Sequence, residues 1–194
     1  MHRRGHYGVD FLVLALIDYI FLSNGHVFFA VVALGALWIE PLPDYDLRTP
    51  LLTHRKTSHS LLAVVVVGGC CAGLGWVVGT YVTMPLLPWL RAEVLLGPQW
   101  RTHVGVLDAA SLSLLGFCVG AGGIVLHLLG DIITVSGIQP LLPFSRWKVA
   151  PLPLRAASPF GNNLLFVSGI LALVAVGVTM TLLDEILLTQ LGLG

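Results

Sequence analysis

The sequence predicts an all-α, polytopic membrane protein, a transmembrane helical bundle of about five spans. Of the 194 residues, 56% are hydrophobic and only 10% are charged, whereas soluble domains have roughly 45–50% apolar and about 25% charged residues. Predominantly apolar stretches long enough to cross a hydrocarbon layer of about 30 Å recur along the chain. Because lipid offers backbone polar groups no partner, each stretch is expected to be helical.

The spans are expected in one integral-membrane, hydrolase-like domain over residues 1–194, at about 5–22, 26–43, 60–83, 107–129 and 163–183. The tripeptide 23–25 is all that separates the first two spans. A single 31-residue helix from Val9 to Ile39 is therefore the alternative, and it would reduce the count to four. Arg3 and Arg4 precede the first apolar run as in a signal peptide, but the carboxylates within that run argue against cleavage.

The basic residues predict the orientation of the bundle. With five spans, the segments on the N-terminal side hold eight Lys and Arg, and the opposite side holds Arg91 and Arg101. This asymmetry places the N-terminus in the cytoplasm and the C-terminus outside, in the cytoplasmic (inner) membrane of the cell. The eight residues are Arg3, Arg4, Arg48, Arg55, Lys56, Arg146, Lys148 and Arg155.

Composition also limits the partners. The formal net charge is zero, so overall charge indicates no nucleic-acid partner, and the lipid bilayer is the expected environment. The sequence leaves the oligomeric state open. The three cysteines fall inside predicted spans, where thiols behave as small apolar side chains, so neither a disulfide framework nor a cysteine metal site is expected.

Small residues at four-residue spacing predict where helices pack closely. They are Gly69/Gly73 and Gly75/Gly79 in the third span and Gly116/Gly120 in the fourth. Such spacing favours tight packing of these two spans. The alternative is that glycine is simply common in membrane helices.

The segment 131–162 contains five prolines and cannot be a spanning helix. It also carries Phe144, Trp147 and Phe160 among basic residues. Aromatic and basic side chains are favoured at the membrane surface, so this segment is expected to be an interfacial loop on the cytoplasmic side.

The chemistry-bearing residues gather at that same side once the spans are placed. Two pairs, His6/Asp10 and His127/Asp131, have the spacing His-x-x-x-Asp. On a helix this spacing puts both side chains on one face, where they can bind one cation together. Ionisable residues near membrane depth are costly, which favours function, although helix caps and polar turns are the alternative reading. The other members of this group are Glu40, Asp44, Asp46, His54 and His59.

An anion pocket is predicted beside these residues. The N-terminus of the third span presents free N–H groups, and hydroxyl and basic side chains lie around it. The predicted substrate-binding residues are Arg55, Lys56, Ser58 and Ser60.

Three segments together resemble the YdjM-like membrane-bound metal-dependent hydrolases. They are 42–46 (Leu-Pro-Asp-Tyr-Asp), 54–62 (His-Arg-Lys-Thr-Ser-His-Ser-Leu-Leu) and 127–134 (His-Leu-Leu-Gly-Asp-Ile-Ile-Thr), and with the early histidine the resemblance covers roughly residues 1–165. The chain departs from the family pattern at 56–58 and at Leu165, where a glutamate is expected. The resemblance implies a metal-binding or catalytic set of His6, Asp44, Asp46, His54, His59, His127 and Asp131.

The interpretation that follows is a metal-dependent hydrolase, analogous to zinc-dependent phospholipases C. It would cleave a phosphoester of a lipid or lipid-linked substrate, with Asp44, Asp46 or Asp131 as the base. One or two divalent ions are expected; the nitrogen and oxygen ligands favour Zn²⁺ and also suit Mn²⁺ or Fe²⁺. An intramembrane metalloprotease is one alternative, although the sequence has no His-Glu-x-x-His helix. A non-catalytic ion or metabolite carrier is the other, and it would need polar residues across the whole bilayer.

Overall fold

The computed structural model describes residues 2–48, 57–86, 108–152, 155–156 and 158–190, with no side-chain description for 46–48 and 184–190. The described chain is helical, with a single isolated antiparallel bridge between Ile138 and Val149. The four long helices are α1 (Arg3–Ser23), α4 (Leu61–Val78), α7 (Ala109–Ile132) and α8 (Pro159–Gln190). The shorter ones are α2 (Val27–Ala33), α3 (Ala36–Ile39), η1 (Leu42–Arg48), η2 (Thr57–His59) and η3 (Gly79–Thr83), a π-helical turn.

Five segments are long and apolar enough to cross a membrane, which confirms the predicted all-α bundle of five spans. They are Arg3–Ser23, Val27–Tyr45, Leu61–Leu86, Ala109–Ile132 and Pro159–Leu183. The second span is not one continuous helix, because it consists of α2, α3 and η1. The fifth begins at Pro159, four residues before the predicted start.

The alternative of a single first helix from Val9 to Ile39 is wrong. The chain turns after Ser23, where Gly25 has a φ of +73° that side chains other than glycine rarely tolerate. The side-chain amide of Asn24 donates to the carbonyl of Ile20 at 2.7 Å and satisfies one of the last carbonyls of α1. α1 and α2 therefore form two spans.

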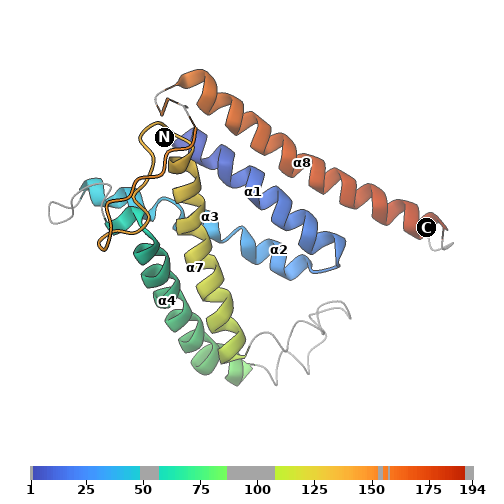
Figure 1. The fold of residues 1–194 in the computed structure, drawn as a ribbon. Helices are drawn as coiled ribbons and strands as arrows, with labels where there is room; N and C mark the ends of the chain where they lie inside the picture. The colour runs from blue at the N-terminus through green and yellow to red at the C-terminus, as the bar shows by residue number, and fades with distance from the viewer. Residues whose placement is uncertain (1, 49–56, 87–107, 153–154, 157, 191–194) are drawn as a thin grey trace.

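The helices are arranged as two pairs, α1 with α8 and α4 with α7, and α7 also contacts α1 and α3 (Figure 1). α4 and α7 pack through glycine, as predicted. A Cβ at Gly75 would meet the backbone of Leu112, and one at Gly116 would meet the backbone of Cys71. Gly69 and Gly73 have open space at the Cβ position, so only part of the predicted small-residue pattern lies in the contact.

The segment after α7 is a loop, as its prolines predict. Ile138 from this loop packs against Ile124 and Leu128 of α7. The backbone carbonyl of Pro140 accepts the Leu61 amide at 2.9 Å, so the loop also holds the first turn of α4. These contacts attach the loop to the end of the bundle where α4 begins.

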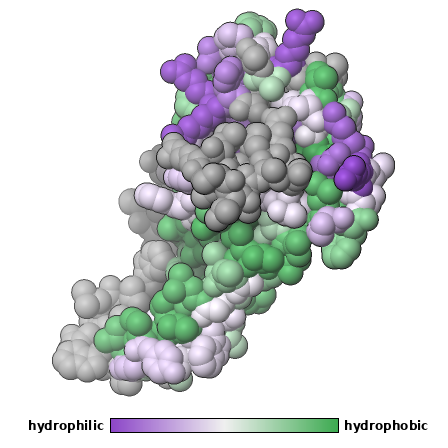
Figure 2. Space-filling view, turned by 90° about the vertical axis from the view of Figure 1, so that its left-hand side faces the viewer, coloured by the Kyte–Doolittle hydropathy of each residue, from purple (hydrophilic) through white to green (hydrophobic). Residues whose placement is uncertain are grey.

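The surface agrees with a membrane environment. Large hydrophobic side chains are exposed along α4 and α8, among them Val65, Leu74, Leu171 and Val174. Hydrophilic residues gather at the end that carries the N-terminus, and hydrophobic residues dominate the adjoining surface (Figure 2). Polar chemistry is thus concentrated at one end of the helices.

The opposite end of α7 has a conventional cap. The Asp108 carboxylate accepts the Ser111 amide at 2.8 Å and the Ser111 hydroxyl at 3.0 Å. These hydrogen bonds hold the pKa of the Asp108 carboxyl below its usual value. Asp108 is therefore a helix cap, as its position before the fourth span indicates.

Candidate metal centre

Four helical segments meet at the end of the bundle that carries the N-terminus. Successive spans alternate in direction, so α1 and α4 begin there while α3 and α7 end there. Histidine and carboxylate residues occupy these termini, and most of them are buried. His127 is fully buried, and Asp131, Glu40, His6 and His59 have at most 3% of their surface exposed. Residues distant in sequence are thus brought into one cluster.

Three possible donors, on Asp44, His59 and His127, lie within 4.8 Å of one another, and Asp131 lies against the two histidines. The Nε2 atoms of His59 and His127 lie 3.2 Å apart. Asp44 Oδ1 lies 3.6 Å from each of these nitrogens. Asp131 Oδ2 lies 3.6 Å from the His59 nitrogen and 3.8 Å from the His127 nitrogen. The side chain of Asp44 is 47% exposed, so the cluster has one accessible side.

The separations that involve the two histidine nitrogens suit the donors of a tetrahedral ion. Ligand distances of about 2.0–2.1 Å around zinc place tetrahedral donors about 3.3–3.4 Å apart. The five distances given above, 3.2–3.8 Å, lie within a few tenths of an ångström of that value. Two imidazoles and two carboxylates are also a donor set that suits zinc and related transition metals.

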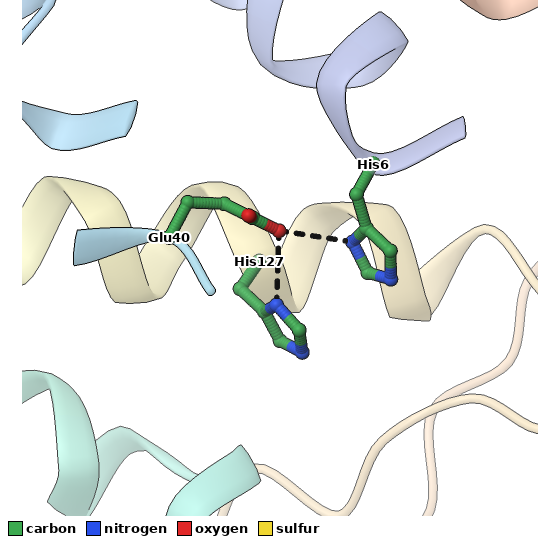
Figure 3. Close-up of side chains that lie close together, drawn as sticks. All are labelled: His6, Glu40 and His127. Atoms are coloured by element: carbon green, nitrogen blue, oxygen red, sulfur yellow. Dashed lines mark hydrogen bonds and ion pairs between the residues drawn. The ribbon is translucent and has the colours of Figure 1, made fainter. Parts of the chain in front are cut away.

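Glu40 fixes the orientation of the His127 ring. Its Oε1 lies 3.0 Å from Nδ1 of His127, and Figure 3 shows the same carboxylate oxygen facing Nδ1 of His6 as well. A proton on Nδ1 that is donated to Glu40 leaves the lone pair on Nε2, facing the other donors. A carboxylate that accepts the second N–H of a histidine is the usual companion of a metal ligand.

Ser58 has the equivalent position for His59, because its Oγ lies 3.0 Å from the ring Nδ1. When Nδ1 of His59 also carries its proton, two Nε2 lone pairs face each other at 3.2 Å. Such a pair is repulsive unless a cation lies against both nitrogens. The donor set and this juxtaposition together fit a metal ion.

His6 stacks on His127 with ring centroids 4.5 Å apart and 11° between the ring planes. Its Nε2 lies 3.5 Å from Asp131 Oδ1, and its Nδ1 lies 3.4 Å from Glu40 Oε1. His6 therefore lies beside Oδ1 of Asp131, the other oxygen from the one that lies near His59 and His127. A second group of possible donors, formed by His6, Glu40 and Nδ1 of His127, lies on this side of the cluster.

Two glycines of α7 allow these approaches. A Cβ at Gly130 would meet the His6 ring, so the absence of a side chain lets α1 lie against the last turns of α7. A Cβ at Gly123 would lie 2.5 Å from Ile39 Cβ, so α3 also approaches α7 closely and delivers Glu40 to His127. In the sequence Gly-x-x-x-His-x-x-Gly-Asp over 123–131, the two glycines thus allow close helix packing, and the histidine and aspartate are the possible donors.

The structure brings together five residues of the predicted set, namely His6, Asp44, His59, His127 and Asp131. Asp46 lies in η1, and its side chain is outside the described part. His54, Arg55 and Lys56 also lie outside the described residues.

Two predicted substrate-binding hydroxyls have partners within the protein. The Ser60 hydroxyl donates to the carbonyl of Thr57 at 2.7 Å, and Ser58 contacts His59. The Leu61 amide is bonded to Pro140, so the first turn of α4 is partly satisfied by the protein itself. Their role toward a substrate stays a prediction.

We expected His6 and Asp10 to bind one cation together, but the structure does not place their side chains as a pair. Asp10 is fully buried, but neither carboxylate oxygen has a hydrogen-bond partner in the described part of the chain. A shared helix face puts the two residues on the same side of α1, yet Asp10 lies one turn deeper in the bundle. His127 and Asp131 do lie together, with Nε2 and Oδ2 3.8 Å apart, and their joint binding of a cation stays a prediction.

These features define a class of protein: an integral membrane protein with a buried histidine and carboxylate cluster at one end of its helices. The chain belongs to the family described as YdjM inner membrane protein, which it matches over residues 1–189. This confirms the resemblance and agrees with an inner-membrane location. No curated protein and no solved structure matches the chain.

Proposed function

We propose that this protein is a membrane-bound, metal-dependent hydrolase that cleaves a phosphoester of a lipid or lipid-linked substrate. The observation that carries the proposal is that Asp44 and Asp131 each place a carboxylate oxygen 3.6–3.8 Å from the Nε2 atoms of His59 and His127, which lie 3.2 Å apart. Costly ionisable groups in a membrane protein favour a function, and a bound cation would offset both carboxylates and both imidazole lone pairs.

One ion of the zinc type fits the proposal best, with Mn²⁺ and Fe²⁺ as the alternatives. A second ion between His6, Glu40 and His127 would compete for Nδ1 of His127, which the bond to Glu40 already uses. When bound, the ion supplies a water molecule of lowered pKa and an electrophile for a phosphoryl oxygen.

In this proposal the residues of the cluster have separate roles. Asp131 and the two histidines are buried and hold the ion, while His6 positions Asp131 through Oδ1. Asp44 is the half-exposed carboxylate of the cluster and borders a cavity of about 160 Å³. Its Oδ2 is therefore the proton acceptor in this proposal, a role for which Asp46 and Asp131 were also predicted candidates.

Phosphoester cleavage is favoured over peptide cleavage by the basic residues next to the cluster. Arg55 and Lys56 directly precede η2, which carries His59. A peptide bond has no need for such positive charge, and the described residues contain no His-Glu-x-x-His helix. The eight-to-two distribution of basic residues supports a cytoplasmic position for this end of the bundle.

A carrier is the second candidate, because α1 contains two buried carboxylates. Asp10 is completely buried and Asp18, eight residues further along, is 7% exposed. Polar groups therefore continue part of the way along α1, which a path for protons or ions requires. No turnover of any substrate, together with metal-dependent ion flux in vesicles, would favour this candidate over hydrolysis.

The first test is metal content. Elemental mass spectrometry of the purified protein should find about one equivalent of a transition metal in the wild type. His59→Ala and His127→Ala should lose most of it, while His26→Ala, at the opposite end of the spans, should keep it. Absence of metal in the wild type, or equal content in all variants, would contradict the proposal.

The second test is turnover. Phospholipids, isoprenoid phosphates, soluble phosphoesters and peptides are screened with wild type and with Asp131→Asn, which should abolish hydrolysis. Neutralising both Arg55 and Lys56 should mainly raise KM, because these residues are expected to bind the phosphate. Metal-dependent peptide cleavage without phosphoesterase activity would overturn the assignment.

A further inference from the structure

Two adjoining cavities lie beside the donor cluster, along α1 and α3. The smaller one, of about 160 Å³, is lined by Arg3, His6, Glu40, Pro41, Asp44 and Tyr45. The larger one, of about 500 Å³, shares Arg3, Pro41 and Tyr45 with it. The larger cavity has the size of ordinary small-molecule sites, which are roughly 300–1,000 Å³.

The two cavities differ in chemistry. Beyond the shared residues, the larger one continues over Tyr7, Phe11, Leu37 and Trp38, which belong to two membrane-spanning segments. Trp38 is 88% exposed, so this wall is open to the surroundings of the protein. Because both segments are long and apolar enough to cross a membrane, this wall would face hydrocarbon chains, whereas the smaller cavity reaches Glu40 and Asp44.

Arg3 lies where the two cavities meet. Its Nε and Nη2 donate to the Tyr7 hydroxyl at 3.0 and 2.8 Å, and its guanidinium carbon lies 5.3 Å from the Tyr7 ring centroid. Tyr7 thus orients the guanidinium, whose other N–H groups can bind the oxygens of a phosphate. Arg4 bonds instead to Asn163 at 3.3 Å and lines neither cavity.

Charge decides what the smaller cavity admits. Glu40 and Asp44 repel a phosphate, so an anion enters only if a cation offsets them. The bound ion would supply part of this compensation, and Arg3 adds to it. The resulting arrangement has one phosphate position, between Arg3 and the cluster, and a hydrocarbon path over Phe11, Leu37 and Trp38.

We infer that the two cavities bind one membrane lipid that carries a phosphate. Arg3 holds the phosphate, and one hydrocarbon chain lies along α1 and α3. This assignment rests on the proposed function and names its substrate class and entry route. A chain that moves from the bilayer into this groove passes from one apolar medium to another and gains little free energy. The groove therefore selects and positions the lipid, while Arg3 supplies affinity.

The test uses the full-length, metal-loaded protein in nanodiscs. A phosphatidic acid with a photoreactive diazirine in one acyl chain is the probe, and a diacylglycerol with the same chains is the uncharged control. Peptide mass spectrometry should locate phosphate-dependent labelling at Phe11, Leu37 or Trp38. Arg3→Gln should lower this labelling about 10-fold, since bonds to a charged group contribute roughly that factor or more. Arg4→Gln carries the same change of charge and should leave it unchanged.

Equal labelling by both probes, or labelling that Arg3→Gln does not reduce, would overturn the inference. So would phosphate-dependent labelling confined to Phe144, Trp147 or Phe160. Metal-dependent hydrolysis that persists under those outcomes would leave the proposed function intact. Arg3-dependent labelling without any hydrolysis would instead support the lipid site and count against the hydrolase.

Discussion

Replacement of Glu40 tests whether a carboxylate behind His127 controls metal binding. Glu40 is 2% exposed, and its Oε1 lies 3.0 Å from Nδ1 of His127. In Glu40→Gln the amide oxygen keeps a neutral hydrogen bond to the ring, whereas Glu40→Ala removes the partner altogether. We predict that affinity for the ion falls in Glu40→Gln and falls further in Glu40→Ala. Both variants keep the four donor residues.

The size of the loss follows from the contact. A buried hydrogen bond to a charged group contributes about 1.5–3 kcal/mol, and a neutral one about 0.5–1.5 kcal/mol. Glu40→Gln should therefore weaken zinc binding by about 1–1.5 kcal/mol, roughly 10-fold. Glu40→Ala should weaken it by roughly 10- to 100-fold, the range found when partners of metal-bound histidines are removed.

The assay is a competition titration of zinc against a chromogenic chelator, in detergent, with thermal unfolding recorded in parallel. Asp108→Asn serves as the control, because it changes a carboxylate that caps α7 at the opposite end. It should leave zinc affinity unchanged. Wild-type affinity in both Glu40 variants would refute the orientation of His127 by Glu40. A loss of all bound zinc in Glu40→Gln would make Glu40 a ligand instead.

Three further predictions concern packing, pH and topology. Gly123→Ala should lower zinc affinity and thermal stability, because its Cβ would lie 2.5 Å from Ile39, while Gly122→Ala, whose Cβ has 4.0 Å of space, should not. The stability that Asp108 contributes should be present at neutral pH and lost as pH falls through its lowered pKa. The free energies of unfolding of wild type and Asp108→Asn, measured against pH, should therefore converge in acid. A cysteine at Thr49 should be labelled by an impermeant thiol reagent from the cytoplasmic side, and labelling from the outside alone would contradict the predicted orientation.

The sequence was sufficient to predict the spans, because apolar length is a direct requirement of the bilayer. It also predicted that the donors lie at one end, since alternating spans bring the N-terminus of α1 and the C-terminus of α7 together. The contact between α1 and α8, in which a Cβ at Gly8 would meet the Leu165 backbone, was not predicted. Helical periodicity does not relate residues that are 157 positions apart in the sequence.

Glu40 shows why part of the candidate site was missed. Its place among the polar residues at this end of the bundle was predicted, but the family resemblance assigned the acidic ligands to Asp44, Asp46 and Asp131. Its partner His127 is 87 residues away, so periodicity cannot connect them. The available signal was a lone acidic residue within an otherwise apolar span, which favours a functional role by its cost alone. Asp10, one of two buried carboxylates in α1, was paired with His6 from helical spacing, which predicts a shared face of the helix but not the depth in the bundle.

The origin of the four donors in distant segments has a consequence for biogenesis. Asp44 and His59 leave the ribosome long before His127 and Asp131 do. Since His59 and His127 are 68 residues apart, this interval lasts several seconds at translation rates of about 5–20 residues per second. During it, the early donors have no partners from α7, so the cluster is incomplete. Under the proposed function, metal loading would therefore follow insertion of α7, and a chain arrested before that helix would leave its acidic and histidine residues exposed to quality-control proteases.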